Sequence, residues 1–464
     1  MRLRTRDMPT WLGFGSLGGL CVVAAGLVAN PLLAIALPVG LLAALFLFAQ
    51  PFLGVVALSV FSHLDAVEKM FFGFLPISAF KLITASAVLT MILRGAELRG
   101  HVRTVLREPI IACGICLIAL GAICSLFAED KRAALDALIT IFSLQVLMIL
   151  VVVFATTTER ITTLIYAVAL TSLVSASILI VEIGTGQTLV AQSEAATTAR
   201  TAEGFDRSSG GSDYNPTTAA SMLLFGVIFA LIHVIESPKL RRVMVTMLAI
   251  GTVAVVLSFA RSAVIAYVLI ALSLIWRYRD EKFVPISMIG ATIAFLIAIP
   301  FIPVEYWARL ASIVGAGGGA DWTLGRRLSY NLIGLDLLTK SPIVGVGPGN
   351  FPNHFTDPEY RFMPGRTLLG RELHNMYLSV MVQFGLASAP FFAMIGFTYS
   401  RLLKVARMPA SPQYRAIALA TAYGFAAYLI ASLFLPNEYT KYTWLLCALG
   451  AALYHNNKRA RDLG

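Results

Sequence analysis

Charged residues are scarce in this chain, and their scarcity excludes a soluble globular protein. Only 13% of the 464 residues are Asp, Glu, Lys or Arg, whereas 58% are hydrophobic and the mean hydropathy is +0.79. A soluble core cannot bury this much apolar side chain. The composition therefore predicts a polytopic membrane protein.

Cysteine and histidine are also few, with five and six residues respectively. The one suggestive spacing, Cys113 with Cys116, lies inside the apolar run 109–127. A structural metal site normally takes four ligands, so we interpret this pair as two small residues within a membrane helix. We expect neither a metal site nor a cofactor.

Apolar runs that can cross a bilayer follow one another along the chain. One helical crossing takes about 20 apolar residues, which predicts an all-α protein with about 12–14 transmembrane helices. The first run follows a basic N-terminus without a small-residue cleavage motif, so we expect an uncleaved span. The third run is the least secure, because it is short and continues into Asp65 and Glu68. The fourteen candidate spans are residues 11–29, 31–49, 51–64, 78–94, 110–127, 137–155, 161–182, 216–235, 243–259, 262–276, 284–303, 374–400, 415–435 and 442–454.

The basic residues divide unequally between the two sides that these spans define. With the N-terminus inside, the inner segments hold 21 of the 36 Lys and Arg residues and eight acidic residues, a net charge of +13. The outer segments carry a net charge of −2. Cytoplasmic loops of membrane proteins are enriched in Lys and Arg, so this asymmetry supports an even number of crossings with both termini in the cytoplasm.

Two outer segments are too long to be simple turns. Residues 184–215 are rich in Ser, Thr, Ala and Gly, a composition that a flexible linker would also have. The larger insertion divides one integral membrane domain into an N-terminal part of the bundle, residues 1–303, a large outer loop, residues 304–373, and a C-terminal part of the bundle, residues 374–464.

The large outer loop should be partly ordered. An apolar stripe at helical spacing predicts an amphipathic helix that lies on the membrane surface or caps the bundle. Small residues at 315–320 are typical of a hinge. Residues 341–351 read as a tight turn, and without a following Gly-Lys-Ser/Thr we expect no nucleotide-binding loop. The stripe consists of Leu328, Leu332, Leu335 and Leu338, with Ile333 and Leu337 beside it.

Charge is nearly absent from the middles of the spans, which argues against an ion-coupled transporter. Lys81, Asp136 and Glu182 lie near predicted helix ends, where a polar head can reach the interface. Polar residues gather instead in the outer loops and at the outer ends of helices. This distribution favours chemistry at the outer interface.

Three outer residues are candidates for that chemistry. Arg261 lies between two apolar runs, where it either reaches lipid headgroups or grips phosphate oxygens with its planar fork. Arg327 begins the predicted amphipathic helix, whose N-terminal amides also favour an anion. His374 opens a membrane helix beside Arg371, where it either caps the helix or, kept neutral by the helix dipole and the nearby charge, accepts a proton.

Short motifs surround these residues between positions 213 and 385. Together they resemble the motifs of the O-antigen ligase and polysaccharide polymerase superfamily of bacterial envelope enzymes. The sequence departs from that pattern at Gln383, where many members have glutamate, at Ala260, commonly a serine, and in the Leu-Ala-Ser after Gly385. The motifs are the asparagine of Asp213-Tyr-Asn215, LSFARSA at 257–263, GRRL at 325–328, PIVGVGPGNF at 342–351, and HNMYL at 374–378 with ten residues between His374 and Gly385.

The resemblance implies a glycosyltransferase of the C-type superfold in the bacterial inner membrane, with its active site facing the periplasm. Such an enzyme transfers a glycan from undecaprenyl diphosphate to an acceptor hydroxyl, without a metal or a nucleotide sugar. It implies that Arg261 and Arg327 bind the diphosphate and that His374 is the general base. The substrate-binding residues expected around them are Arg326, Arg371, Asn375, Tyr377 and Asn215.

The expected function is polymerisation of exopolysaccharide or O-antigen repeats, with transfer to a lipid A core acceptor as the close alternative. The partners would be the lipid-linked glycan donor, a glycan or lipid A core acceptor, and membrane lipids. We expect no nucleic acid, because the inside bias accounts for the net charge of +11. The alternative from another class is a transporter for a lipid or polysaccharide, in which replacing Arg261 or His374 would leave polymer length unchanged.

Overall fold

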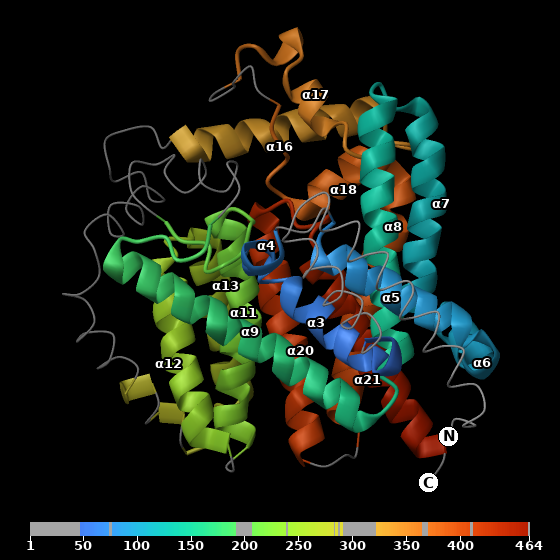
Figure 1. Ribbon diagram of the computed structural model, residues 1–464. Helices are drawn as coiled ribbons and strands as arrows, with labels where there is room; N and C mark the ends of the chain where they lie inside the picture. Colours follow the sequence, from blue (N-terminus) through green and yellow to red (C-terminus); the bar gives the residue numbers. More distant parts are fainter. Residues whose placement is uncertain are drawn as a thin grey trace, which may run out of the picture.

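Helices joined by turns and loops make up the described part of the chain, and no strand occurs in it (Figure 1). The structure is a computed structural model that describes residues 47–73, 77–191, 207–237, 240–282, 284–285, 288–290, 322–363, 370–408 and 412–462. The predicted all-α polytopic membrane fold is confirmed. The predicted hinge at 315–320 lies outside the described residues.

The first half of the described chain contains α3 (Pro51–Phe61), α4 (Asp65–Phe72), α5 (Ala79–Leu93), α6 (Gly95–Leu106), α7 (Pro109–Phe127), α8 (Lys131–Phe154), α9 (Thr158–Thr185), α11 (Pro216–Glu236), α12 (Arg241–Leu257) and α13 (Arg261–Arg277). The second half contains α16 (Trp322–Lys340), α17 (Phe351–Phe355), η3 (Pro358–Tyr360), α18 (Met376–Phe384), η4 (Gly385–Ser388), α19 (Ala389–Arg407), α20 (Pro412–Ala431), η5 (Ser432–Phe434) and α21 (Lys441–Asp462).

Six segments in the described residues are long and apolar enough to cross a membrane, or eight if two bent helix pairs each count as one span. The candidate spans 11–29, 31–49 and 284–303 fall wholly or largely outside the described residues. The total of about 12–14 therefore remains a prediction. The six segments are Pro109–Phe127, Lys131–Phe154, Thr158–Thr185, Pro216–Glu236, Met376–Arg407 and Gln413–Phe434.

The candidate spans 51–64 and 78–94 each contain one helix, α3 or α5, and a sharp bend leads from each into a second helix. α3 and α4 meet at 112°, and α5 and α6 meet at 107°. The first bend coincides with Asp65, which is 8% exposed and accepts a hydrogen bond from the backbone N–H of Asp213 at 2.7 Å. A charged turn held by an outer loop cannot continue as an apolar span, so the third candidate is a broken or re-entrant segment.

The core is centred on α11, which packs against α9, α12, α13 and α20. Sixteen of its 21 residues are buried, which is the pattern of a helix that neighbours surround. Small residues permit these close approaches: a Cβ on Gly226 would lie 2.4 Å from the Cβ of Ser172 on α9. A Cβ on Gly424 of α20 would lie 2.8 Å from the ring of Phe225. Close helix contact through small residues is characteristic of membrane bundles.

The described part of the large loop, residues 322–363 and 370–373, forms a cap with a small core of its own. The predicted amphipathic helix is present as α16, which lies across one end of the bundle (Figure 1). Ile333 and Leu337 are buried, whereas Leu328, Leu332 and Leu335 are 42–56% exposed, so the buried face is offset from the predicted leucine stripe. The cap core consists of Tyr330, Ile333, Leu337, Val346, Phe351, Phe355, Tyr360, Leu373, Leu378 and Val382.

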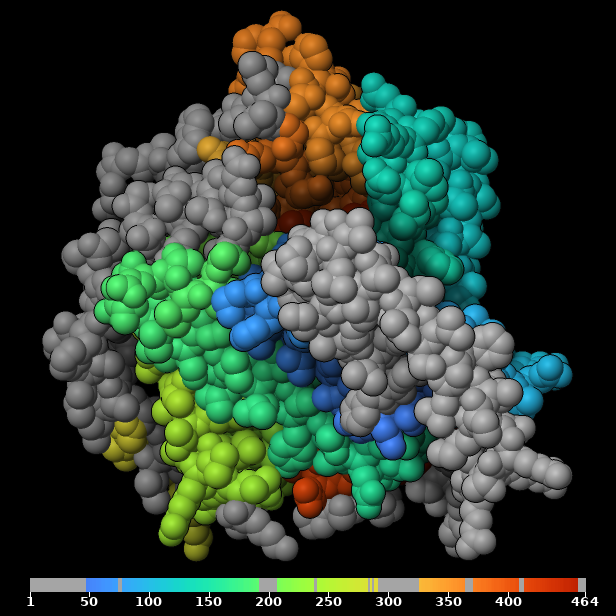
Figure 2. Space-filling model, in the orientation of Figure 1, coloured from blue at the N-terminus to red at the C-terminus, as the bar shows by residue number. Residues whose placement is uncertain are grey.

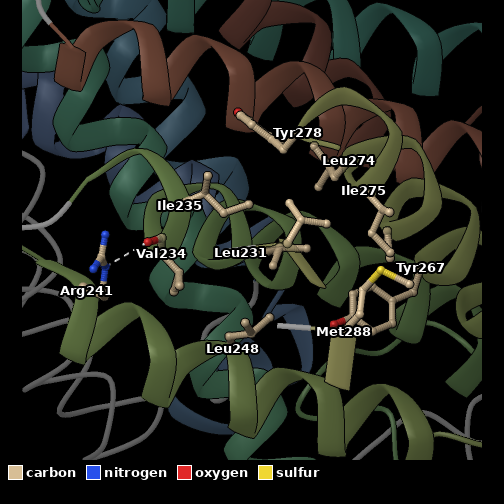
Figure 3. A pocket seen from close by; sticks show the side chains of 12 residues that line it. Leu231, Val234, Ile235, Arg241, Leu248, Tyr267, Leu274, Ile275, Tyr278 and Met288 are labelled. Carbon is tan, nitrogen blue, oxygen red and sulfur yellow. Dashed lines mark hydrogen bonds between the residues drawn. The ribbon is translucent and has the colours of Figure 1, made fainter. Parts of the chain in front are cut away.

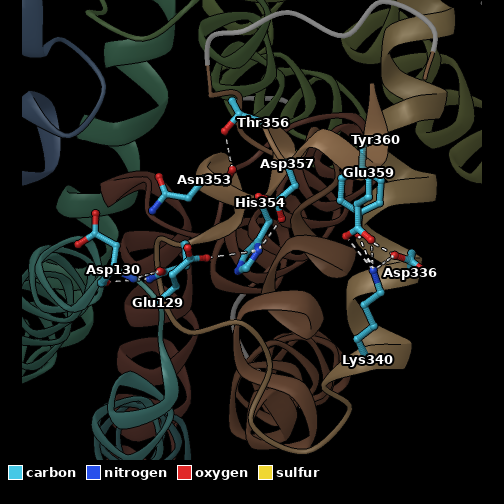
Figure 4. Close-up of polar contacts among 11 residues, drawn as sticks. Glu129, Asp130, Asp336, Lys340, Asn353, His354, Thr356, Asp357, Glu359 and Tyr360 are labelled. Carbon is cyan, nitrogen blue, oxygen red and sulfur yellow. Dashed lines mark hydrogen bonds and ion pairs between the residues drawn. The ribbon is translucent and has the colours of Figure 1, made fainter. Parts of the chain in front are cut away.

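Polar contacts hold the segments of the cap together (Figure 4). Lys340 Nζ lies 2.8 Å from both Asp336 Oδ2 and Glu359 Oε1, and the Tyr360 hydroxyl donates to Asp336 Oδ2 at 2.6 Å. These contacts tie the end of α16 to η3. The Asn350 side chain accepts from the backbone N–H of Asp130 at 2.8 Å and donates to its carbonyl at 3.1 Å, which docks the cap on the α7–α8 turn.

Candidate active site

A cluster of arginines lies beneath the cap. Arg207, in the loop that leads into α11, is 5% exposed. It is close enough to Arg327 and Arg261 to interact electrostatically with both. Burial is the main cause that lowers the pKa of Arg207 to about 10, and the charges of Arg327 and Arg261 lower it further. Three guanidinium groups from distant parts of the sequence therefore share one region. Such a concentration of positive charge is expected where an anion binds.

The turn between α12 and α13 positions two of these arginines. The Ser258 carbonyl accepts hydrogen bonds from Nε and Nη2 of Arg207 at 3.1 and 3.0 Å. Phe259 follows with φ of 53°, the single positive φ outside glycine in the described residues. Arg261 then opens α13. A left-handed backbone at a bulky residue costs about 1–3 kcal/mol, so the surrounding structure holds this turn in place.

Glu182 organises the loop that carries Arg207. The side chain is fully buried, and its Oε1 accepts from the backbone N–H groups of Leu189 and Val190 at 2.8 and 3.2 Å. Its Oε2 accepts from the Ser208 hydroxyl at 2.5 Å. The expectation that Glu182 reaches the membrane interface is therefore wrong, because the carboxylate is turned inward to satisfy these loop donors.

His374 lies between the cap and the start of α18. Its ring centroid is 5.2 Å from that of Tyr330 on α16, and its Nδ1 is buried without a hydrogen-bond partner. Burial, with smaller contributions from the charges of Arg327, Arg371 and Arg326, lowers the pKa of the imidazole to about 3. Arg327 is thus an electrostatic neighbour of both His374 and Arg207. The imidazole is neutral at physiological pH.

The other predicted binding residues divide into two groups. Arg326 and Arg371 lie near His374, as their electrostatic effect on it requires. Asn215 and Asn375 cap α11 and α18, each accepting two backbone N–H groups of the first turn with its side-chain oxygen. The Tyr377 hydroxyl donates to the carbonyl of Leu429 at 2.8 Å, within the bundle. Substrate contacts by these residues remain predictions.

Glycines set the shape of the segment that packs beside α18. Gly345, Gly347 and Gly349 all have positive φ, of 67°, 95° and 69°. The turn they form pairs with the end of α18, because the N–H of Gly347 donates to the carbonyl of Gln383 at 3.0 Å. Gly385 ends α18 with φ of 56°, and a Cβ there would lie 2.6 Å from the backbone of Ile343. The spacing from His374 to Gly385 therefore corresponds to one short helix and the turn that stops it.

The surface is hollowed between the orange cap, the teal α7–α8 pair and the blue and green segments, with dark red C-terminal atoms in its depth (Figure 2). A separate cavity of about 750 Å³ lies among α11, α12 and α13 (Figure 3). It is lined mainly by apolar side chains such as Leu231, Leu248 and Leu274, with Arg241 at its edge. Because Arg241 and Tyr278 lie at the ends of α12 and α13 opposite to Ser258 and Arg261, this cavity is distinct from the arginine cluster.

The described fold is that of an all-α polytopic membrane protein, and part of the chain is similar to a known ligase family. The model of the O-antigen ligase family matches residues 244–393 of this chain. The match spans Arg261, Arg327, His374 and Gly385, and it confirms the resemblance predicted from the motifs. A comparison with curated proteins finds no match.

Two residues were not predicted from the sequence: Arg207 and the buried acid Glu438, which precedes α21. Arg207 lies in the Ser- and Gly-rich segment 184–215, whose composition is also that of a linker. It could have been noticed as an arginine among small polar residues, in a segment predicted to lie on the outer side, where basic residues are fewer. Glu438 had no such signal, because its burial depends on contacts with α18 that only the fold creates.

Proposed function

We propose that this protein transfers an oligo- or polysaccharide from undecaprenyl diphosphate to an acceptor hydroxyl at the periplasmic face of the inner membrane. The observation that carries the proposal is a neutral histidine beside an arginine cluster, because the reaction needs a proton acceptor next to a developing diphosphate anion. His374, Arg261 and Arg327 are the proposed catalytic residues, and Arg207 joins them as a donor-binding residue.

In the proposed reaction, the acceptor oxygen attacks the anomeric carbon of the donor glycan and a new glycosidic bond forms. The bond between that carbon and the diphosphate oxygen breaks, and the electron pair leaves with the diphosphate. The acceptor proton moves to the imidazole of His374 and later to solvent. The guanidinium groups stabilise the additional negative charge on the leaving group.

Binding of the donor would also change the pKa of the proposed base, His374. A pKa of about 3 makes the imidazole of His374 a weak proton acceptor by itself. Part of that depression comes from the charges of Arg327, Arg371 and Arg326. A bound diphosphate offsets these charges, which raises the pKa of the imidazole toward a working range. The base therefore becomes effective when the donor is in place.

The periplasmic orientation is supported by contacts among residues that the charge count assigns to the cytoplasm. Glu108 forms an ion pair with Arg401, and the rings of His101 and His455 lie 5.6 Å apart. These residues thus gather at one end of the bundle. Arg261 begins α13, whose other end is the inward-assigned Arg277, so the arginine cluster belongs to the opposite end.

We favour polymerisation of exopolysaccharide or O-antigen repeats, with ligation to lipid A core as the alternative that the description of the matching family raises. The surface polysaccharide of a deletion strain separates the two on a gel. A polymerase deletion leaves single repeats on an intact anchor, whereas a ligase deletion removes the anchored form.

The test of catalysis is replacement of His374, Arg261 and Arg327 by alanine in the full-length protein. Each variant should lose at least about 100-fold in transfer and accumulate unjoined lipid-linked donor, because removal of a general base or an oxyanion-stabilising group has effects of this order. Arg361→Ala is the matched control, since Arg361 is an exposed arginine of the same cap. Normal amounts of full-length product from His374→Ala would refute the catalytic assignment, and altered glycan transport without altered polymer length would favour a transporter.

A further inference from the structure

One carboxyl group and one amide connect α18 to two other segments. The Ser379 hydroxyl donates to Glu438 Oε1, and Gln383 Nε2 donates to the same oxygen at 3.3 Å. Gln383 Nε2 also donates to the Ser379 hydroxyl at 2.8 Å. Gln383 Oε1 accepts from the backbone N–H of Gly349 at 2.7 Å and from the Tyr439 hydroxyl. The glycine turn, α18 and the segment before α21 are therefore linked through two side chains.

Glu438 lies where an ionised carboxylate is costly. The residue is 3% exposed, and its Oε2 is buried without a hydrogen-bond partner. The titratable groups that interact with it are Glu372, before α18, and Tyr428 and Tyr439, none of which supplies a positive charge. Lys441 follows closely in sequence but interacts with Asp65 and Glu68.

The hydrogen bonds agree with a neutral acid. Both neighbouring donors point at Oε1 and Oε2 receives none, so the protein satisfies only one oxygen of a group that needs donors at both when it is ionised. Burial, reinforced by the charge of Glu372, raises the pKa of Glu438 to about 8, while Ser379 and Gln383 act in the opposite direction. A buried acid that reduces stability and is nevertheless held by two specific donors indicates a role beyond packing.

The position of the network on α18 relates it to the candidate base. Asn375 caps this nine-residue helix directly after His374. Ser379 and Gln383 follow Asn375 at intervals of four residues, so all three lie on one face of the helix. A group that holds Ser379 and Gln383 therefore fixes the axial position and rotation of the helix that begins at the histidine.

We infer that Glu438 is a positioning residue that acts in its neutral form, holding α18 through Ser379 and Gln383 so that His374 stays under Tyr330 and beside Arg327. Ionisation places a negative charge beside Glu372, where none of the described residues that interact with Glu438 carries a positive charge, and this favours separation of the segment before α21 from α18. The inference rests on the proposed function for its catalytic consequence. The neutral state of the carboxyl can be tested independently of that function.

The catalytic test is the pH–rate profile of the purified full-length protein with a lipid-linked donor. Wild-type kcat should fall about tenfold per pH unit above the pKa of Glu438, whereas Glu438→Gln keeps an oxygen acceptor without the titration and should remain active to higher pH. Ser379→Ala removes a donor that favours the ionised form, so it should move the alkaline fall to higher pH. Glu97→Gln, the same change at an exposed position on α6, should retain the wild-type profile. An alkaline fall unchanged in Glu438→Gln and Ser379→Ala would overturn the inference.

Thermal unfolding as a function of pH tests the buried carboxyl without any activity. The pKa of Glu438 is about 8 in the folded protein and near 4.5 when the side chain is exposed, so the unfolded state loses the proton first as pH rises. Wild type should therefore lose stability between about pH 4.5 and 8 relative to Glu438→Gln, with a constant difference above that range. A pH-independent difference would overturn the inference even if transfer were observed. If the stability difference between wild type and Glu438→Gln changes with pH as expected but the protein transfers no glycan, the proposed function is refuted and the neutral buried carboxyl is retained.

Discussion

Arg207 combines a structural contact with a place in the arginine cluster. Its guanidinium bonds the Ser258 carbonyl through two nitrogens and Thr217 Oγ1 through Nη2 at 3.1 Å. Lysine carries the same charge but cannot reproduce this fork. We expect Arg207→Lys to raise KM for the lipid-linked donor by about tenfold, consistent with the loss of one charge-assisted contact. Steady-state kinetics check this, with Arg132→Lys at an exposed position of α8 as the control, and an unchanged KM would contradict it.

The pH dependence of the reaction should differ between the free and donor-bound protein. His374 has a pKa of about 3, so the imidazole stays able to accept a proton until the pH falls near that value. The kcat/KM profile reports the free protein and should show no histidine-dependent fall above about pH 4. The kcat profile reports the donor-bound state. Its acidic limb should lie at a higher pH than that of kcat/KM, because the diphosphate raises the pKa of His374. Identical acidic limbs in the two profiles would contradict this coupling.

Residue types that are unusual for their surroundings were predictable from the sequence. Arg261, Arg327 and His374 stand out because the outer side has fewer basic groups and the chain has few histidines. Glu182 was misinterpreted because its position near a helix end is equally typical of an interfacial carboxylate. Its burial results from a loop that folds back over it, with Ser208 from beyond the end of the helix. Such long-range contacts leave no local pattern.

At the scale of elements, α18 depends on the turn that ends it. Gly385 has φ of 56°, and a Cβ there would lie 2.6 Å from the backbone of Ile343. Gly385→Ala should therefore reduce stability by about 1–3 kcal/mol and lower transfer, because the strain falls on the helix that follows His374. Thermal unfolding and transfer rates check the prediction. Gly396→Ala is the control, since a Cβ at Gly396 on α19 meets nothing within 4 Å, and equal effects of the two changes would contradict it.

The presence of a helix was easier to predict from the sequence than its buried face or the bend at its end. Apolar periodicity identified α16, but its buried face depends on the cap core that Phe351 and Phe355 contribute. Hydropathy likewise identified the apolar runs of α3 and α5 without indicating the bends that follow them. A run of apolar residues specifies burial in lipid or protein, whereas the bend depends on the partners of its polar neighbours, such as Asp65 with the loop at Asp213.

At the scale of the whole molecule, composition was sufficient for the fold class and charge asymmetry for a hypothesis about orientation. The orientation can be tested with single cysteines in a protein whose five native cysteines are replaced by alanine. Phe362 in the cap is 84% exposed, and Glu97 on α6 is exposed in a segment assigned to the cytoplasm. Phe362→Cys should react with a membrane-impermeant maleimide in cells with a permeable outer membrane, because the inside bias predicts a periplasmic cap. Glu97→Cys should react only after the inner membrane is opened. Retained transfer activity in both variants controls for folding, and the reverse labelling pattern would place the arginine cluster on the cytoplasmic side and refute the proposed donor.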